Sequence, residues 1–299
     1  MPRTLVLSAL VAGALVAAPA RAQEAARPVE TDSGWTLRTR LPAGAWVRVF
    51  TFNGEVDVRE GTGDQLEVRA VKQGRRTRWD RVFFESRRDG DNVTVCAIYG
   101  NDADCDNDGI HGSTNSSNVG TRFLVTVPRG ARVRVGSGNG EVEVRAAVAE
   151  AHVGTGNGEV SVIGIRGPVH ASTGNGELRV EDVEGAVEAS TGNGRVTVNT
   201  TSGPVNVRTG NGSIDVRMAR LTGTGDMEFH TGNGRVSVAL PANFEGEIDS
   251  NTGSGHLESD FPMQVNGRMD SRNMRGTIGK GGRRIRMSSG NGDLELRKM

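Results

Sequence analysis

The sequence is poor in the residues on which several classes of protein depend. Its 299 residues include only 8 Phe, 3 Trp and 1 Tyr, so the aromatic subsites of a polysaccharide-active enzyme would be hard to build. Lys and Arg together number 36, as do Asp and Glu, and a nucleic-acid partner normally requires a concentrated basic face. We therefore expect no nucleic-acid partner. After the N-terminal residues, no segment is long and apolar enough to span a membrane.

The first residues predict export. Arg3 provides a small positive region, and residues 5–18 form an apolar run that is too short to span a bilayer. Ala20-Arg21-Ala22 then gives the small-x-small pattern that a signal peptidase cleaves. We interpret 1–22 as a signal peptide and 23–33 as a flexible N-terminus. The mature chain is expected in the periplasm, at the cell surface or in the medium, with no integral membrane segment.

Cysteine is nearly absent as well. The only two cysteines, Cys96 and Cys105, lie nine positions apart. In an exported chain we expect them to form a disulfide that closes the loop between them. A free catalytic thiol is the alternative, and it would need a base beside it, for which His111 is the only histidine near in sequence.

The loop that the second cysteine enters is acidic. Asp104, Asp106 and Asp108 occupy positions one, three and five of a calcium-loop pattern. Position twelve would be Asn115, where a bidentate glutamate is usual. Calcium is therefore one interpretation, and a solvated acidic turn neutralised by upstream arginines is the other. No other cofactor is expected.

Glycine, in contrast, is abundant, with 43 residues, and it recurs at a fixed interval. Gly-Asn-Gly occurs five times with its asparagine 18 residues after the last, then returns after 22 residues and once more near residue 291. These asparagines are Asn139, Asn157, Asn175, Asn193, Asn211, Asn233 and Asn291. A fixed period of this length is typical of a solenoid. Each turn leads into a strand pattern, whereas a phosphate-binding glycine loop would need a helix to follow.

Each repeat reads as two short strands and two corners. Val160 and Val162 alternate with polar residues, and after a Gly-Pro corner Val169 and Ala171 do the same. Asn-Gly is the pair that most readily accepts the positive φ of a sharp corner. The sequence therefore predicts an all-β parallel β-solenoid, or β-helix, with two short strands per coil of about 18 residues.

A second match between distant segments of the sequence indicates how far the solenoid extends. Residues 41–58 match residues 127–144 at 11 of 18 positions, so the repeat is expected to run over 34–299. Residues 72–122 interrupt it with longer and less regular strands. We interpret them as an insertion or cap that carries the Cys96/Cys105 loop and covers one open end, because a bare terminal coil would expose unpaired edges.

Three features together resemble a known family. They are the Pro-x-Gly-Ala motif at 128–131, the repeated Thr-Gly-Asn-Gly-[Glu/Arg]-Val-x-Val, and the closing Ser-Gly-Asn-Gly-Asp-Leu-Glu-Leu at 289–296. The chain is similar, over residues 34–298, to a "putative adhesin" family of exported bacterial proteins, a domain of unknown function. The resemblance implies a right-handed β-solenoid and an envelope or surface location.

Stacking of coils about 4.8 Å apart would place residues 18 apart in the sequence side by side. One outward column then reads Arg134, His152, His170, Glu188 and Asn206. Two histidines and a glutamate could hold a transition metal, or the column could be solvated. A second column begins with Glu141, Glu159 and Glu177. Its spacing is near the carboxylate separation of retaining glycosidases, and an acidic stripe is the alternative.

The sequence thus predicts a non-catalytic exported envelope or cell-surface β-solenoid, an adhesin or binding scaffold without an identified ligand. Solenoids offer long, regular binding faces, and nothing in the sequence concentrates chemistry at one point. The expected partner is an envelope or surface protein or a glycan. A polysaccharide-active β-helix enzyme and a calcium-stiffened structural scaffold are the alternatives.

Overall fold

The computed structural model describes residues 28–100, 103–111, 119–200, 203–222, 224–265, 270 and 272–299. Within them, strands alternate with turns, and one short 3-10 helix, η1 (Arg76–Arg81), is present without any α-helix. The predicted signal peptide, residues 1–22, lies outside the described residues, as does the first part of the segment 23–33.

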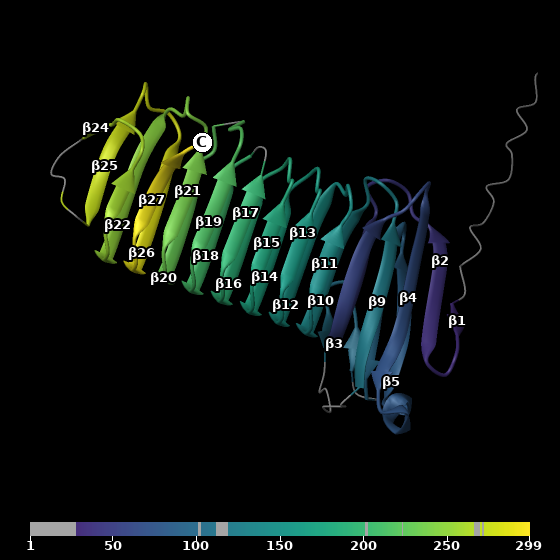
Figure 1. Ribbon diagram of the computed structural model, residues 1–299. Helices are drawn as coiled ribbons and strands as arrows, with labels where there is room; N and C mark the ends of the chain where they lie inside the picture. The colour runs from purple at the N-terminus through teal and green to yellow at the C-terminus, as the bar shows by residue number, and fades with distance from the viewer. Residues whose placement is uncertain are drawn as a thin grey trace, which may run out of the picture.

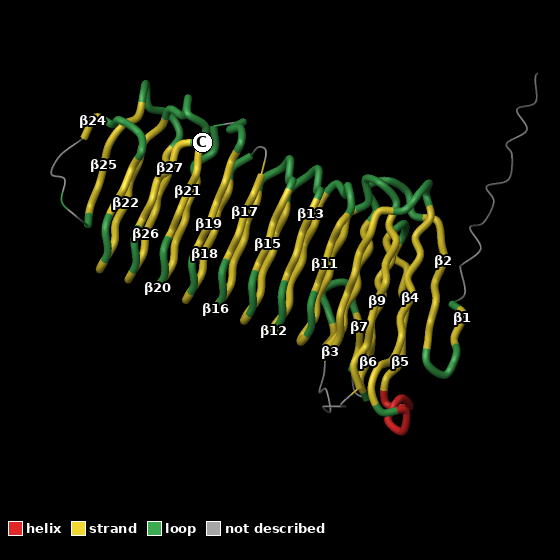
Figure 2. Tube along the Cα trace, in the orientation of Figure 1, coloured by secondary structure: helices red, strands yellow, loops and turns green. Residues whose placement is uncertain are grey.

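Each coil contributes one strand to each of two facing sheets, and the coils stack in parallel along one axis (Figure 1). In one repeat, β12 (Glu150–Asn157) leads into the Asn-Gly corner and β13 (Val160–Ile163) returns in the opposite sheet. Residues 164–168 then form the second corner, and the corners follow one another along the edges of the stack (Figure 2). This arrangement confirms the predicted all-β parallel solenoid with two short strands per coil.

The first sheet holds the strand before each Asn-Gly corner, and the second sheet holds the strand after it. In spatial order the first sheet contains β5 (Val82–Asp89), β6 (Asn92–Tyr99), the first half of β3 (Trp46–Glu60), β10 (Arg132–Asn139), β12, β14 (Val169–Asn175), β16 (Val187–Asn193), β18 (Val205–Asn211), β20 (Met227–Asn233), β26 (Arg284–Asn291), β22 (Gly246–Ser254), β25 (Asn273–Ile278) and β24 (Gln264–Val265).

The second sheet contains, in spatial order, β1 (Val29–Glu30), β2 (Gly34–Arg40), β4 (Gln65–Gly74), β9 (Val119–Val127), the second half of β3, β11 (Val142–Arg145), β13, β15 (Leu178–Glu181), β17 (Val196–Thr200), β19 (Ile214–Met218), β21 (Val236–Leu240), β27 (Leu294–Lys298) and β23 (Leu257–Ser259). Outside both sheets, β7 (Asp104–Cys105) and β8 (Ile110–His111) form a small antiparallel hairpin.

The core lies between the two sheets and is built from the apolar positions of the period-two pattern. Val160 and Val162 of β13 are fully buried, and Val169 and Ala171 of β14 face them from the next coil. Successive strand residues point to opposite faces, so the residues between them point outward. Because each repeat buries the same positions, every coil adds several valine-sized side chains to one continuous core, at roughly 1.5–3 kcal/mol each.

A ladder of asparagine amides joins the corners. Each Nδ2 donates to Oδ1 of the asparagine in the adjacent coil, at 2.7–2.8 Å. The donor–acceptor pairs are Asn157–Asn139, Asn175–Asn157, Asn193–Asn175, Asn211–Asn193, Asn233–Asn211 and Asn291–Asn233. These asparagines lie at the corners, as the repeat predicts, although none of them has a positive φ.

The positive φ falls instead on the glycine after each asparagine. Gly194 has a φ of 149°, and a Cβ at this position would lie 1.9 Å from the carbonyl oxygen of Gly176 in the preceding coil. The corner therefore needs glycine for close approach between coils as well as for backbone conformation.

A buried hydroxyl precedes each Gly-Asn pair. Thr155 Oγ1 donates to the carbonyl oxygen of Gly140 at 3.0 Å, and Thr173 Oγ1 donates to that of Gly158 at 2.9 Å. Ser137 and Ser289 make the equivalent bonds at their own corners. A hydroxyl buried without a partner would be costly, so this bond allows a polar residue to point into the core beside the corner.

The coils do not stack in chain order at either end. At the N-terminal end, β3 comes first in the sequence but lies inside, with β6 and β9 outside it. At the other end, β26 and β27 lie between the earlier pairs β20/β21 and β22/β23 (Figure 1). Asn291 consequently bonds to Asn233, which is 58 residues away in the sequence.

Antiparallel strands flank the parallel stack in both sheets at the N-terminal end and in the first sheet at the C-terminal end, where the second sheet ends in the parallel strand β23. At the N-terminal end, β4 pairs with β9, β2 with β4, and β5 with β6. At the C-terminal end, β25 pairs with β22, and β24 pairs with β25. Residues 72–122 supply β5, β6, η1 and parts of β4 and β9 to the N-terminal end. Such strands cover edges that would otherwise invite pairing with another chain.

The corner geometry predicts a graded loss of stability. Asn193→Ala removes two amide hydrogen bonds of the ladder and should lower the free energy of unfolding by about 2 kcal/mol, at about 1 kcal/mol each. Gly194→Ala should cost more, because its Cβ would overlap a carbonyl of the neighbouring coil. Urea unfolding followed by circular dichroism measures both losses.

Gly164→Ala is the matched control. Gly164 also has a positive φ, of 78°, but no atom lies within 4 Å of a Cβ built there. Its substitution should cost only the conformational strain, about 1–2 kcal/mol. Equal losses for Gly164→Ala and Gly194→Ala would contradict the close approach of the coils.

Candidate binding groove

The strand register brings the predicted column of polar side chains together on the outer face of the first sheet. Arg134 of β10 pairs with His152 of β12, which pairs with His170 of β14. Glu188 of β16 and Asn206 of β18 continue the row. The prediction from the 18-residue period is confirmed for this column.

The two histidines of this row are each hydrogen-bonded to a glutamate. His152 Nε2 lies 2.8 Å from Glu150 Oε1, and His170 Nδ1 lies 3.0 Å from Glu188 Oε2. Their ring centroids are 4.6 Å apart. Within the part of the chain that the structure describes, no group of three or more His, Cys, Asp or Glu side chains converges as metal ligands would. The row is therefore a series of hydrogen-bonded pairs.

A groove of about 910 Å³ runs beside this row. Its floor is the next outward position of each strand, occupied by Gly136, Gly154, Ser172 and Ser190. These residues have no side chain or a short one, so the sheet is bare between the histidine row and the Asn-Gly corners. Gly136 must stay small, since a Cβ there would lie 2.8 Å from the ring of Phe50.

Bulky and charged side chains bound the groove at its two ends. Phe50 and Phe52 of β3 stand at the N-terminal end, together with Ile110. Arg208 and Glu228 stand at the other end, joined by an ion pair of 2.9 Å. The sequence analysis missed this groove, although a signal exists: the residue before the buried hydroxyl is Gly or Ser in successive repeats and becomes arginine at Arg208.

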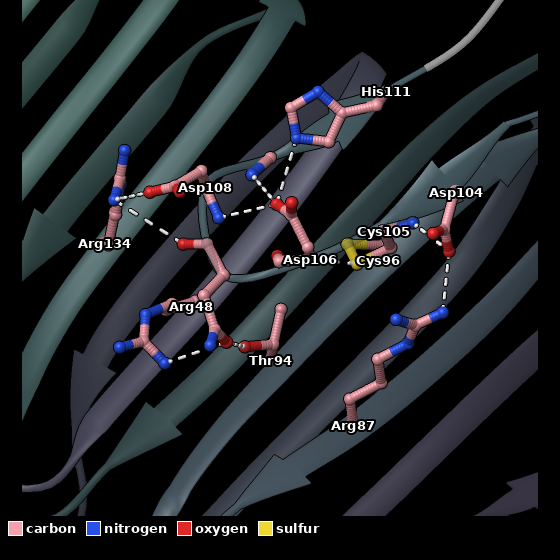
Figure 3. A network of polar contacts seen from close by, with 12 residues as sticks. Arg48, Arg87, Thr94, Cys96, Asp104, Cys105, Asp106, Asp108, His111 and Arg134 are labelled. Carbon is pink, nitrogen blue, oxygen red and sulfur yellow. Dashed lines mark hydrogen bonds and ion pairs between the residues drawn. A yellow bond between two sulfur atoms is a disulfide. The ribbon is translucent and has the colours of Figure 1, made fainter.

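The loop that borders the N-terminal end is fastened to the first sheet (Figure 3). The predicted disulfide between Cys96 of β6 and Cys105 of β7 is confirmed, and both cysteines are buried. Asn107 Oδ1 accepts hydrogen bonds from Arg48 and Thr94 at 3.2 and 3.0 Å. These ties hold the loop across three neighbouring strands, so its position relative to the groove is fixed.

The three aspartates proposed as calcium ligands turn to different partners. Asp104 forms an ion pair with Arg87 at 2.6 Å, and Asp108 forms one with Arg134 at 3.0 Å. Asp106 Oδ1 accepts the backbone N–H of Asp108 at 2.8 Å and lies 3.0 Å from His111 Nε2. Asn115, the twelfth position of the pattern, lies outside the described residues. The carboxylates therefore serve to fold the loop and to attach it.

Asp106 is held in its charged form by these contacts. The backbone hydrogen bond from Asp108, with those from His111 and Gly109, holds the pKa of the Asp106 carboxyl below its usual value. Hydrogen bonds that favour a carboxylate lower its pKa in this way. The loop is thus folded around the ionised carboxylate of Asp106, which is hydrogen-bonded to other residues of the same loop.

The second predicted column lies at the corner of the other sheet. The register stacks Glu141, Glu159 and Glu177 in successive coils, with Glu55 beyond them. Partial burial, together with the charges of Glu159 and Glu55, raises the pKa of the Glu141 carboxyl. Like charges at coil spacing disfavour ionisation of one another. The column is an acidic stripe along the corner of the second sheet.

The parallel solenoid and its repeated corners define a β-helix-like repeat protein of unknown function. The chain belongs to the Toastrack family (DUF4097), whose model matches residues 49–297. This match confirms the resemblance drawn from the Gly-Asn-Gly motifs. No curated protein matches the chain. In the part of the chain that the structure describes, no helix is long and apolar enough to cross a membrane.

Solved structures similar to the chain include a "putative cell adhesion protein" from Clostridium sporogenes, 9% identical, with a TM-score of 0.29 and coverage of 91% of this chain and 100% of that one. A "putative adhesin" from Bacteroides fragilis is 8% identical, with a TM-score of 0.43 and coverage of 90% and 98%. A third, from Parabacteroides distasonis, is 9% identical, with a TM-score of 0.25 and coverage of 88% and 96%. These values carry no information about a ligand.

Loss of the disulfide should loosen the loop without unfolding the solenoid. The bond closes a loop with a sequence separation of 9, and its removal should cost the loop about 2–3 kcal/mol. In a Cys96→Ser/Cys105→Ser variant, amide hydrogen exchange should speed up in residues 103–111 and stay unchanged in β12 to β18. Reduction of the wild-type protein should reproduce this pattern. Unchanged protection of 103–111 would show that the polar contacts alone hold the loop.

The raised pKa of Glu141 predicts a pH-dependent stability. Because its folded pKa lies above the unfolded value of 4.5, the folded state binds the proton more tightly, and stability falls as the pH rises through this window. Glu141→Gln should therefore give a small rise in Tm at pH 7 that disappears below about pH 4. Glu67→Gln, which removes a carboxyl whose pKa is lowered by hydrogen bonds from Arg69 and Arg38, is the control and should give no rise. A lower Tm for Glu141→Gln at pH 7 would exclude the repulsion.

Proposed function

We propose that the protein is a non-catalytic binding protein of the bacterial envelope or cell surface, and that it holds an extended ligand along the groove of its first sheet. The observation that carries the proposal is the groove itself. Its lining comes from seven consecutive strands, from β3 to β20. At a strand spacing of about 4.8 Å it is about 29 Å long, which suits an elongated ligand better than a compact one.

The repetition of the lining supports a binding role. Each coil presents one side chain of the polar row and one floor residue, so similar contacts recur along the axis. Solenoids commonly use extended surfaces of this kind for recognition. A ligand with a repeating structure would meet the same environment at each coil, and its affinity would grow with the number of coils that it covers.

The carboxylates of the groove support a non-catalytic role. Asp108 is paired with Arg134, Glu188 with His170, and Glu228 with Arg208. Glycoside hydrolysis needs two carboxyl groups with different protonation states on either side of the scissile bond. A carboxylate that is already paired with an arginine, as Asp108 and Glu228 are, is poorly suited to act as the acid of such a couple.

Export is part of the proposal and rests on two features. The N-terminal residues have the pattern of a signal peptide, and Cys96 and Cys105 form a disulfide. Disulfides persist in the periplasm and outside the cell and are rare in the reducing cytosol.

Site-specific photocrosslinking in intact cells tests the groove. A photoreactive phenylalanine analogue in place of Phe52, whose exposed ring lines the groove, should give a covalent adduct with an envelope component. The same analogue at Thr197, which faces outward on the second sheet, is the matched control and should give none. Ser190→Arg, which fills the floor of the groove, should abolish the adduct at Phe52.

Two results would contradict the proposal. Adducts of equal yield from Phe52 and Thr197 would place the ligand elsewhere than in the groove. Release of new reducing ends from purified envelope polysaccharide, lost in Glu188→Gln, would show that the protein is an enzyme. The Glu188→Gln variant must have the melting curve of the wild type, so that the loss of this activity is not caused by unfolding.

A further inference from the structure

The charges around the groove point to the chemical class of its ligand. Its two arginines and three carboxylates are all engaged with one another or with a histidine: Arg134 with Asp108 at 3.0 Å, Arg208 with Glu228 at 2.9 Å, and His170 with Glu188 at 3.0 Å. A polyanion or a polycation would have to break these pairs to be neutralised. An uncharged ligand would leave them intact.

The same side chains retain hydrogen-bonding capacity for an uncharged ligand. A guanidinium has five N–H donors and a carboxylate has about four acceptor positions, so one contact leaves several free. Ser172 and Ser190 add hydroxyls to the floor, and neither has a hydrogen-bond partner among the described residues. The groove therefore presents both hydrogen-bond donors and acceptors, which matches the hydroxyl groups of a sugar.

The spacing of the coils fits one sugar ring per coil. Equivalent positions recur about every 4.8 Å along a straight axis. This interval is close to the length of one ring in a fully extended β-1,4-linked chain, which is a flat, straight ribbon. An α-1,4-linked chain coils and would leave the sheet after a few rings. The bare floor of Gly136, Gly154 and the two serines admits a flat ribbon close to the backbone.

An aromatic side chain marks one end. Phe52 is 36% exposed, and its ring packs edge to face against Tyr99, with centroids 6.1 Å apart. The contact with Tyr99 fixes the ring and leaves another part of it exposed at the groove, where the C–H face of a sugar ring can stack. Because this is the one exposed aromatic ring among the described lining residues, most of the affinity must come from chain length.

We infer that the groove binds an uncharged β-1,4-linked polysaccharide, aligned with the solenoid axis, with one ring per coil and a terminal ring on Phe52. This inference rests on the proposed function and gives the ligand its chemical class. The polar row hydrogen-bonds one edge of the ribbon, and the serine hydroxyls contact its underside.

The test uses the full mature chain and oligosaccharides of defined length in isothermal titration calorimetry. The neutral probes are cellohexaose, chitohexaose and β-1,4-mannohexaose, each with its trimer. Hexamannuronate is the charged counterpart of mannohexaose, and maltohexaose is the α-1,4 counterpart of cellohexaose. We expect one or more of the neutral hexamers to bind. A hexamer that binds should do so at least tenfold more tightly than its own trimer. It should also bind at least tenfold more tightly than its charged or α-linked counterpart, where it has one.

Two variants locate the binding. Phe52→Ala should weaken the binding of that hexamer roughly fivefold, and Ser172→Trp should abolish it by filling the floor. Thr197→Trp, the matched substitution on the second sheet, should leave it unchanged. Melting curves like that of the wild type establish that each variant is folded, and if Ser172→Trp fails this check, Ser190→Arg replaces it.

The inference is overturned if no neutral hexamer binds, if hexamannuronate binds as tightly as mannohexaose, or if binding survives a folded variant with a filled floor. Failure of the proposed function is a separate result. Photocrosslinks from Phe52 in cells, without any affinity for the neutral hexamers, would support a ligand in the groove and show that it is not a neutral β-1,4-linked sugar. Absence of both would reject the proposed function as well.

Discussion

The close approach of one Asn-Gly corner to the next is the contact on which the rest of the structure depends. A Cβ on Gly194 would lie 1.9 Å from the Gly176 carbonyl oxygen, so only glycine lets the coils stack there. The asparagine amides then form one hydrogen-bonded ladder along the stack. This contact fixes the register of both sheets, because a slip of one residue would move the buried valines to the outer face. The rows of surface side chains follow from the same register.

Much of this arrangement could be predicted from the 18-residue period. The period identifies the solenoid, the asparagine ladder and the row that brings His152, His170 and Glu188 together. The order of the end coils could not be predicted, because the period breaks where the chain turns back. Asn291 lies beside Asn233 through strand pairing that no spacing in the sequence reveals. The partners of the aspartates in the 104–108 loop could not be predicted either, since their spacing does not show that Arg87 and Arg134 form ion pairs with two of the carboxylates.

The groove arises from a difference between repeats that are otherwise alike. The repeat requires an apolar residue inside and accepts different residues at the outward position before the buried hydroxyl. In four consecutive coils that position holds Gly136, Gly154, Ser172 and Ser190, whereas β3 supplies Phe50 and β18 supplies Arg208. Small residues in the middle and large ones at the ends form the groove. Its aromatic end lies where β3 and the disulfide-bonded loop meet the first sheet. Architecture and recognition are thus encoded at different positions of one repeat.

The interleaving at the far end of the stack affects how the protein is assembled during synthesis. The strands β26 and β27 fill a layer between two coils that precede them in the chain. Until they arrive, β20 and β22 have no parallel neighbour in that layer, and a nascent chain carries an unfilled slot flanked by strand edges. Once β26 and β27 are in place, this layer resists fraying, because each of its strands is hydrogen-bonded to a coil on either side. The two coils would have to separate before these strands could unpair.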